Sequence, residues 1–278
     1  MDPVTALHTV ARQYCIERSA FWRRHYAELV ASGQAEVSGP GGGWSYSATA
    51  FDVFPRYQML AAIQREVERF IPTDFSSFDD ARQILELAGE TAQSQFTKYS
   101  NPVAIAATQD ERQKFSFFVD SADYARLASQ PPLPFCRVLG TTEHQKLHRS
   151  VAQRWGKWYG GCVDMKEIAS DVVTLHVAAM KEPESYEGLR AALIERGISR
   201  VFELRESGDG FEIETNTASF AYDGAEGFWT SGDSAWMVYS SHESSVTFGS
   251  AWLVERMRSL VPEFERYIYR GYDLAGYF

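Results

Sequence analysis

Cysteine is scarce in this sequence, and the few cysteines are widely separated. The three are Cys15, Cys136 and Cys162, and no two of them form a Cys-x-x-Cys pair. Disulfide frameworks and zinc ribbons use cysteines in even numbers at short, regular spacing. The sequence therefore indicates neither, and the three thiols fit a reducing cytoplasm.

Basic residues are too few for a protein that binds nucleic acid. Lys and Arg number 27 against 37 Asp and Glu, so the formal net charge is -10. Neutralising phosphates requires a concentrated excess of positive charge, so nucleic acid is not an expected partner. A basic protein, in contrast, would be attracted to this chain.

Long apolar segments are missing as well. The best apolar run, VVTLHVAAM, is far shorter than the roughly 20 residues that cross a bilayer. The first residues, MDPVTALHTVARQYC, lack the basic and apolar regions of a secretion signal. We therefore expect a soluble, cytoplasmic protein that does not contact membranes.

The residues that are present suffice for a packed core. The chain has 278 residues, of which 45% are hydrophobic and 23% charged, and this length favours one large or two moderate domains. Aromatic residues make up 14% of the chain, a supply that serves cores and recognition surfaces alike.

The first half is predicted to be helical, because its apolar residues recur three and four positions apart. One long helix is expected to run from Leu7 to Leu29, and a second to cover FPRYQMLAAIQREVERF with Pro55 near its start. The segment SGQAEVSGPGGG between them is expected to be a loop and lacks the ending of a phosphate-binding loop. Further helices are expected after Ser77, which can cap one, and after Asn101.

Three prolines in SQPPLP, at positions 129–134, mark the expected boundary between a helical domain at 1–130 and a second domain at 131–278. In the second domain, segments whose apolar residues have the period of a helix alternate with segments that have the period of a strand. Helices are expected at TEHQKLHRSVAQRW, SYEGLRAALIER and AWLVERMRSL, and strands at DVVTLHVAA, SRVFELRE, FEIET, AWMVYSS and SVTFGS. The predicted fold class is α+β, with a largely antiparallel sheet flanked by helices.

His144 and His148 are a candidate pair of metal ligands. They lie four positions apart on a predicted helix, so both lie on one face. Glu143 does not complete an HExxH motif, which needs Glu directly after the first His, and no third ligand stands out. Apolar residues share this helix face, which favours a structural role for both histidines. No cofactor is expected.

Ser241, His242 and Glu243 place a hydroxyl, an imidazole and a carboxylate side by side between two predicted strands. Neighbours on a strand point to opposite faces, so the three converge only if the backbone turns there. Both faces of AWMVYSS are apolar, which predicts a central strand. At the turn, His242 and Glu243 can serve as acid and base, or can stabilise the turn by bonding its backbone.

The glycine-punctuated segment YDGAEGFWTSGDSAW leads into the same strand and adds Glu226, Trp229 and Asp233 to this group. One interpretation is a recognition surface with a carboxylate rim. Its proposed binding residues are Trp229, Trp236, Asp233 and Tyr239. The alternative is that the aromatic rings only cover the sheet.

YDGAEGFWTS and WMVYSSHESSVTFGS, with FCRVLGTTEHQKLHRSVAQRWG upstream, resemble a block in a family of uncharacterised bacterial proteins. The block has the pattern W-x-x-Y-x-S-H-E-x-S-[IV]-T-F. The likeness covers the second domain and extends to FDVFPRYQMLAAIQREVE in the first, while Ala235 and Ser250 depart from the Asp and Gly of the pattern. It implies a bacterial origin and a fixed structural block, and no activity.

Hypotheses from different functional classes follow. The first is a cytoplasmic bacterial module, of the immunity or accessory type, that binds a basic protein through an acidic, aromatic-rich surface. The alternative is a small-molecule hydrolase in which His242 is the base and Glu243 or Glu226 orients it. A third is a metalloprotein that uses His144 and His148.

Overall fold

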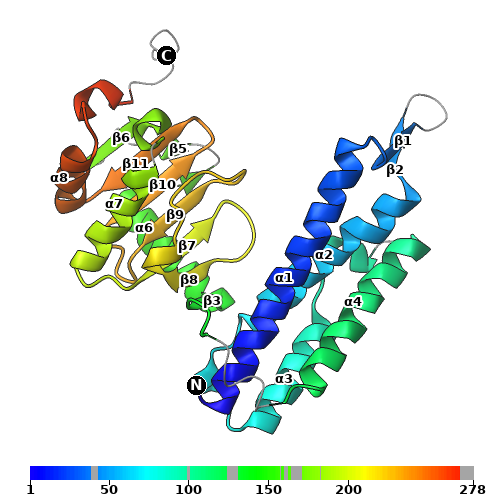
Figure 1. The fold of residues 1–278 in the computed structure, drawn as a ribbon. Coiled ribbons are helices and arrows are strands. Elements are labelled where there is room, and N and C mark those ends of the chain that lie inside the picture. The colour runs from blue at the N-terminus through cyan, green and yellow to red at the C-terminus, as the bar shows by residue number, and fades with distance from the viewer. Residues whose placement is uncertain are drawn as a thin grey trace. The chain divides into compact units, whose positions relative to one another are not determined.

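The proline-rich segment around residue 131 separates two units of the chain. In a computed structural model the division falls after Leu133, which gives the units Met1–Leu133 and Pro134–Phe278. The structure describes residues 1–38, 43–98, 101–123, 131–156, 158–159, 162–163, 171–181 and 183–269. The α+β class is confirmed, because helices dominate the first unit and an antiparallel sheet forms the centre of the second (Figure 1).

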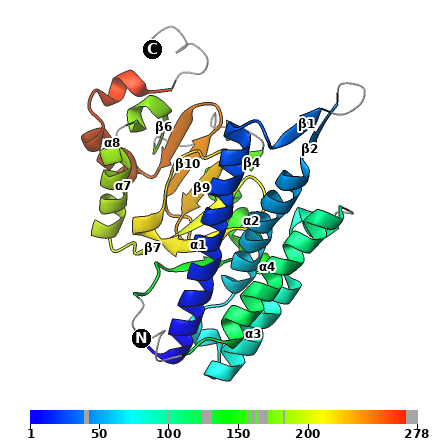
Figure 2. The same cartoon turned by 45° about the vertical axis from the view of Figure 1, so that its right-hand side comes forward.

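Four long helices run side by side in the described part of the first unit (Figure 2). They are α1 (Pro3–Ala31), α2 (Ala48–Val67), α3 (Phe78–Thr91) and α4 (Pro102–Asp120). Two short 3-10 segments, Pro72–Asp74 (η1) and Gln95–Lys98 (η2), lie in the connections. In the described residues, no helix combines the length and the apolar character needed to cross a membrane.

Side-chain caps fix where these helices begin. Ser77 accepts the backbone N–H of Asp80 at 3.1 Å, as predicted, and so satisfies a donor in the first turn of α3. For α2 the prediction is wrong: the helix begins at Ala48, because Ser47 caps it by accepting the N–H of Ala50 at 3.1 Å. Pro55 therefore lies inside α2 and not near its start.

The segment between α1 and α2, predicted to be a loop, is partly a hairpin. Glu36–Ser38 (β1) pairs antiparallel with Trp44–Tyr46 (β2). The prediction is wrong at these residues because backbone pairing on both sides of the glycines overrides the weak strand preference of the sequence. Residues 39–42, which hold part of the glycine run, lie outside the described residues.

Each of the four helices contributes fully buried side chains to one core. Among them are Leu7 of α1, Ile63 of α2, Leu85 of α3 and Phe115 of α4. Burying such a side chain contributes about 1.5–3 kcal/mol. Helices α3 and α4 approach closely at Gly89, where an added Cβ would lie 2.6 Å from Cδ1 of Phe115. A side chain at position 89 would push the two helices apart.

The second unit is built on a seven-stranded sheet with the order β3-β8-β7-β9-β10-β11-β6, in which all neighbours are antiparallel. Its strands are β3 (Cys136–Val138), β6 (Val172–His176), β7 (Arg200–Arg205), β8 (Phe211–Glu214), β9 (Gly227–Thr230), β10 (Met237–Ser241) and β11 (Ser245–Gly249). The prediction that AWMVYSS is a central strand is confirmed, since β10 lies between β9 and β11 and is buried throughout. A separate short pair joins β4 (Trp158–Tyr159) to β5 (Cys162–Val163).

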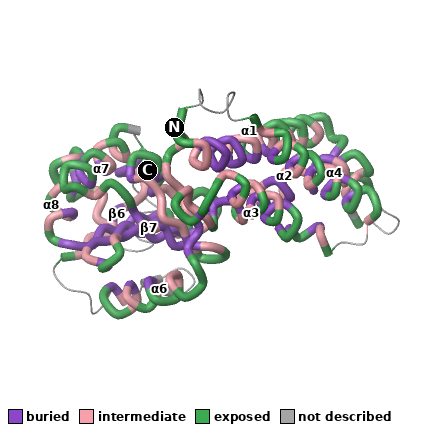
Figure 3. Tube along the Cα trace, turned by 90° about the horizontal axis from the view of Figure 1, so that it is seen from below, coloured by how far each residue is buried: buried purple, intermediate pink, exposed green. Residues whose placement is uncertain are grey.

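Helices cover both faces of this sheet (Figure 3). Helix α6 (Thr141–Trp155) packs Leu147 and Val151 on one face, while α7 (Pro183–Glu195) and α8 (Ala251–Leu260) pack on the other. The remaining 3-10 segments are Val177–Met180 (η4), Thr215–Thr217 (η5) and Phe264–Tyr267 (η6). The central strands are therefore buried on both sides, as their apolar sequences predicted.

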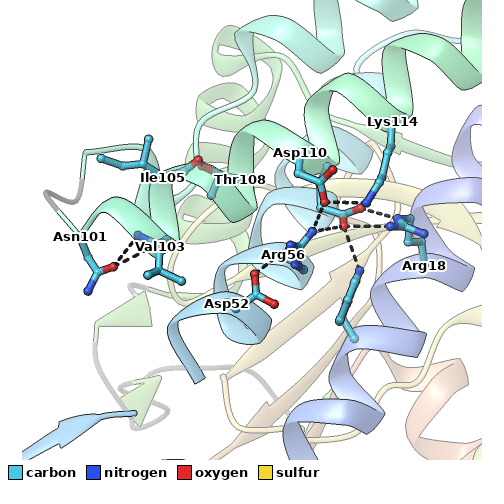
Figure 4. A network of polar contacts seen from close by, with 12 residues as sticks. Arg18, Asp52, Arg56, Asn101, Val103, Ile105, Thr108, Asp110 and Lys114 are labelled. Atoms are coloured by element: carbon cyan, nitrogen blue, oxygen red, sulfur yellow. Dashed lines mark hydrogen bonds and ion pairs between the residues drawn. The ribbon is translucent and has the colours of Figure 1, made fainter. Parts of the chain in front are cut away.

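A buried carboxylate joins three helices of the first unit. Glu111 of α4 has no exposed surface and accepts hydrogen bonds from Arg18 of α1, from Arg56 of α2 at 2.9 Å and from the indole of Trp22 at 3.1 Å. Figure 4 shows Arg18 and Arg56 converging on this network, where Arg56 also meets Asp52 and Asp110. An unpaired charge at this position would be costly, so the network fixes how α4 sits against α1 and α2.

Replacing Glu111→Ala should lower the free energy of unfolding of the helical unit by about 3 kcal/mol or more, because Arg18, Arg56 and Trp22 lose their common acceptor. Urea unfolding followed by helical circular dichroism measures this. The matched control is Glu66→Ala, which removes a surface pair with Arg69 and should cost under about 1 kcal/mol. Equal losses in the two variants would contradict the role given to Glu111.

Candidate functional site

The candidate site lies where the β10–β11 hairpin turns. Ser241 pairs with Ser245, which leaves a three-residue loop of His242, Glu243 and Ser244. Ser244 takes a left-handed backbone conformation with φ 57°, as the third residue of such a loop commonly does. Its carbonyl accepts the N–H of Val177 at 2.8 Å, which ties the turn to the end of β6. The predicted hairpin is confirmed.

Glu226, directly before β9, is the buried centre of the site. Its side chain is fully buried, and it accepts hydrogen bonds from the hydroxyls of Tyr239 at 2.7 Å and Ser241 at 3.0 Å. Tyr239 and Ser241 occupy alternate positions of β10, so their side chains lie on one face of the sheet. The backbone N–H of His242 donates to the same carboxylate at 3.3 Å. These donors replace the water that a buried carboxylate would lose.

His242 is held between two carboxylates. Its Nδ1 lies 2.5 Å from Oε1 of Glu226, and its Nε2 lies 3.1 Å from Oε1 of Glu243. The hydrogen bond with Glu226, helped by the charges of Glu226, Glu243 and Glu206, raises the pKa of His242 above its ordinary value of 6.5. About half of the imidazole side chain, 47%, is exposed, and Glu243 is 31% exposed. The hydrogen bond to Glu226 therefore fixes the orientation of the ring, while about half of the side chain stays exposed to solvent.

This arrangement can move a proton. A carboxylate on Nδ1 fixes the ring orientation and stabilises the imidazolium, which leaves Nε2 to exchange protons with a molecule outside. Glu243 competes for Nε2 and is itself partly exposed. The sequence could not decide between a catalytic and a turn-stabilising His242. In the structure the ring bonds to two side chains, whereas the turn backbone is bonded by Glu226 and Ser241.

Three of the four residues predicted to form an aromatic recognition surface are buried. Trp229, Trp236 and Tyr239 have exposed fractions of 0%, 2% and 3%. They lie on or next to β9 and β10, whose two faces are covered by helices, so their rings belong to the core. Trp229 donates its indole N–H to the buried carboxylate of Glu203 at 2.8 Å, which satisfies its polar group inside the unit.

Asp233 is exposed but is not part of the site. It lies in the turn between β9 and β10, at the opposite end of β10 from His242. Its Oδ1 accepts a hydrogen bond from the hydroxyl of Ser231 and one from the N–H of Ala235, which together lower its pKa. Asp233 therefore stabilises its own turn.

The sequence did not predict the role that two residues of the site have in the structure. Tyr239 was expected to bind a partner and Ser241 to belong to a reactive trio, yet both donate to Glu226. Their spacing of two on a predicted strand was the available signal, since it places both hydroxyls on one face. What the sequence lacked was the distance to Glu226, which lies directly before a different strand, β9.

The structure keeps His144 and His148 together on α6, with ring centroids 6.3 Å apart. His144 packs against Gly210, and burial together with the charge of His148 lowers its pKa. A cluster of three or more His, Cys, Asp or Glu side chains suited to a metal ion does not occur among the described residues. The pair lines a shallow surface depression with Gln145 and Arg149.

His242 should titrate above pH 6.5, because Glu226 stabilises its charged form. The charged pair contributes stability fully below the unfolded-state pKa near 6.5, and this contribution is lost as pH rises through the raised pKa of the folded protein. NMR titration of the histidine rings measures the midpoints, with His144 as an internal reference that should titrate below 6.5. Glu226→Gln should lower the His242 midpoint. A His242 midpoint at or below that of His144 would contradict the assignment.

Comparison of the chain with protein-family models, with curated proteins and with solved structures found no match. The resemblance to a bacterial family therefore stays a prediction.

Proposed function

We propose that this protein is a protein-binding module and that it binds its partner through the helical unit. One observation carries the proposal. Among the described residues, large apolar side chains remain exposed chiefly in the first unit. They are Met1, Ile16, Phe21, Val30, Val37, Leu87, Val103, Ile105 and Phe117 in the first unit, and Ile194 and Tyr222 in the second.

Exposed apolar side chains in such number favour an interaction surface. Single ones are ordinary on soluble proteins, and the nine on the described part of the first unit against two on that of the second favour the first unit as the place where a partner binds. Phe117 is the clearest case, since 73% of it is exposed on α4. The described part of the second unit exposes fewer large apolar side chains, and Trp229 and Trp236 are buried in its core. The net charge of -10 adds long-range attraction to a basic partner.

The proposal includes the kind of partner and the cellular setting that the sequence indicated. The partner is a basic protein, and the setting is the bacterial cytoplasm, where an immunity or accessory factor would act. Support for the setting comes from the wide separation of the three cysteines in the sequence and from the family resemblance. The proposal does not place a partner-binding surface on the sheet or on the aromatic residues of the second unit.

A comparative pull-down tests the proposal. The bait is the full chain, as wild type, as the helical-unit variant Phe21→Ser/Ile105→Ser/Phe117→Ser, and as the control Ile194→Ser/Tyr222→Ser, which changes exposed side chains of the second unit. We expect a bacterial protein that wild type and control retain, that the helical-unit variant loses at least about tenfold, and that high salt releases. Circular dichroism confirms that each bait is folded.

Two outcomes would overturn the proposal. One is that wild type retains nothing above the empty matrix. The other is that the retained protein is lost from the control and kept by the helical-unit variant.

A second candidate function is favoured by the geometry of His242. Hydrolysis of a small ester needs a base that takes a proton from water while the water oxygen attacks the carbonyl carbon. About half of the His242 side chain is exposed, with its Nε2 3.1 Å from the partly exposed Glu243, and the buried carboxylate of Glu226 lies 2.5 Å from Nδ1. That backing is the arrangement by which a carboxylate orients a histidine base.

Hydrolysis of p-nitrophenyl acetate separates this candidate from the first. Replacing His242→Gln should reduce the rate by about 100-fold or more if His242 is the base. The control His25→Gln removes a comparably exposed histidine of α1 and should leave the rate unchanged. Equal rates in wild type and His242→Gln would eliminate the hydrolase.

A further inference from the structure

The groove between α3 and α4 combines negative charge with an exposed aromatic ring. Its walls carry Glu86 and Glu90 from α3 and Phe117 and Asp120 from α4. The space between them has a volume of 590 Å³. We propose that this groove binds a basic amphipathic helix of the partner protein, an inference that rests on the proposed protein-binding function.

The groove is a fixed feature of the fold. Gly89 lets α3 approach Phe115 of α4 closely, which brings the two helices together beneath the groove. Arg112 then donates two hydrogen bonds across the pair, to the carbonyls of Glu90 and Ala92. These carbonyls end α3 and have few partners within their own helix, so Arg112 stabilises the end of the helix. The walls are therefore in place before a partner arrives.

The charge of the groove selects a basic occupant. Three carboxylates, on Glu86, Glu90 and Asp120, line it. Arg112 is the cation of the lining, and its guanidinium is directed to the end of α3 by the two hydrogen bonds to carbonyls. Lys or Arg side chains of a partner would complement the surplus of negative charge.

Length and shape favour a helix. The lining residues of α4 run from Gln109 to Asp120, and at 1.5 Å per residue this stretch is about 16 Å long. Three turns of a partner helix have the same length. A helix in such a groove places apolar residues three and four positions apart against the protein, and Phe117 supplies the apolar contact. Basic residues at the edges of that stripe would reach the carboxylates.

The probe is a fluorescent 18-residue peptide of Leu and Lys arranged as an amphipathic helix, with a matched peptide that has Glu in place of Lys. Fluorescence anisotropy measures binding to the full chain. We expect the Lys peptide to bind and the Glu peptide not to bind. Glu86→Gln/Glu90→Gln should weaken binding about tenfold, and Phe117→Ser should weaken it further.

The control removes the same number of charges elsewhere on the helical unit. Glu17→Gln/Glu28→Gln, on exposed positions of α1, should change binding less than about twofold, since distant surface charges are screened. Equal weakening by the two double variants would overturn the groove, as would a wild-type chain that fails to bind the Lys peptide.

The experiments can overturn the groove proposal without overturning the proposed protein-binding function. Using Glu86→Gln/Glu90→Gln as bait in the pull-down should lose the protein that wild type retains. If that bait keeps the protein while Phe21→Ser/Ile105→Ser/Phe117→Ser loses it, the groove is wrong and the protein-binding function stands. If wild type retains no protein, the function itself is wrong.

Discussion

Each unit encloses a carboxylate that water cannot reach, and the surrounding chain must supply its hydrogen bonds. Glu111 draws donors from α1 and α2, whereas Glu226 draws them from β10 and the turn that follows. Leaving either group without donors would cost several kcal/mol, so the elements that provide them are fixed relative to it. The orientation of His242 is one result: although half exposed, its ring is constrained by a group that is fully buried.

The two units differ in where some of their aromatic residues lie. In the second unit the sheet is covered on both faces, so Trp229 and Tyr239 are enclosed and their polar atoms bond to carboxylates inside the unit. In the described part of the helical unit, some outward positions of the helices hold large apolar side chains, and Phe117 is exposed. A binding surface is therefore better sought on the helices than on the sheet, even though the sheet region has more tryptophan.

Most of the fold was accessible from the sequence because it depends on local patterns. The period of apolar residues predicted the helices, and the serine at position 77 predicted a helix cap. The apolar character of both faces predicted the central strand at 237–241. The start of α2 was missed, since Ser47 supplies a cap that overrides the cue of Pro55. The site was accessible only in part: His242 and Glu226 were both candidates, but their contact depends on how β9 pairs with β10. Burial of Trp229 was equally out of reach, because it depends on layers contributed by distant helices.

The place of β6 in the sheet has a consequence for how the protein folds during synthesis. β6 is made early in the second unit, yet its partner β11 is among the last strands of the chain, and Ile268 closes its other side later still. Until β11 leaves the ribosome, an apolar strand has an open edge. The four helices, in contrast, are complete before the sheet begins. We expect the helical unit to fold first and the nascent second unit to depend on protection from aggregation.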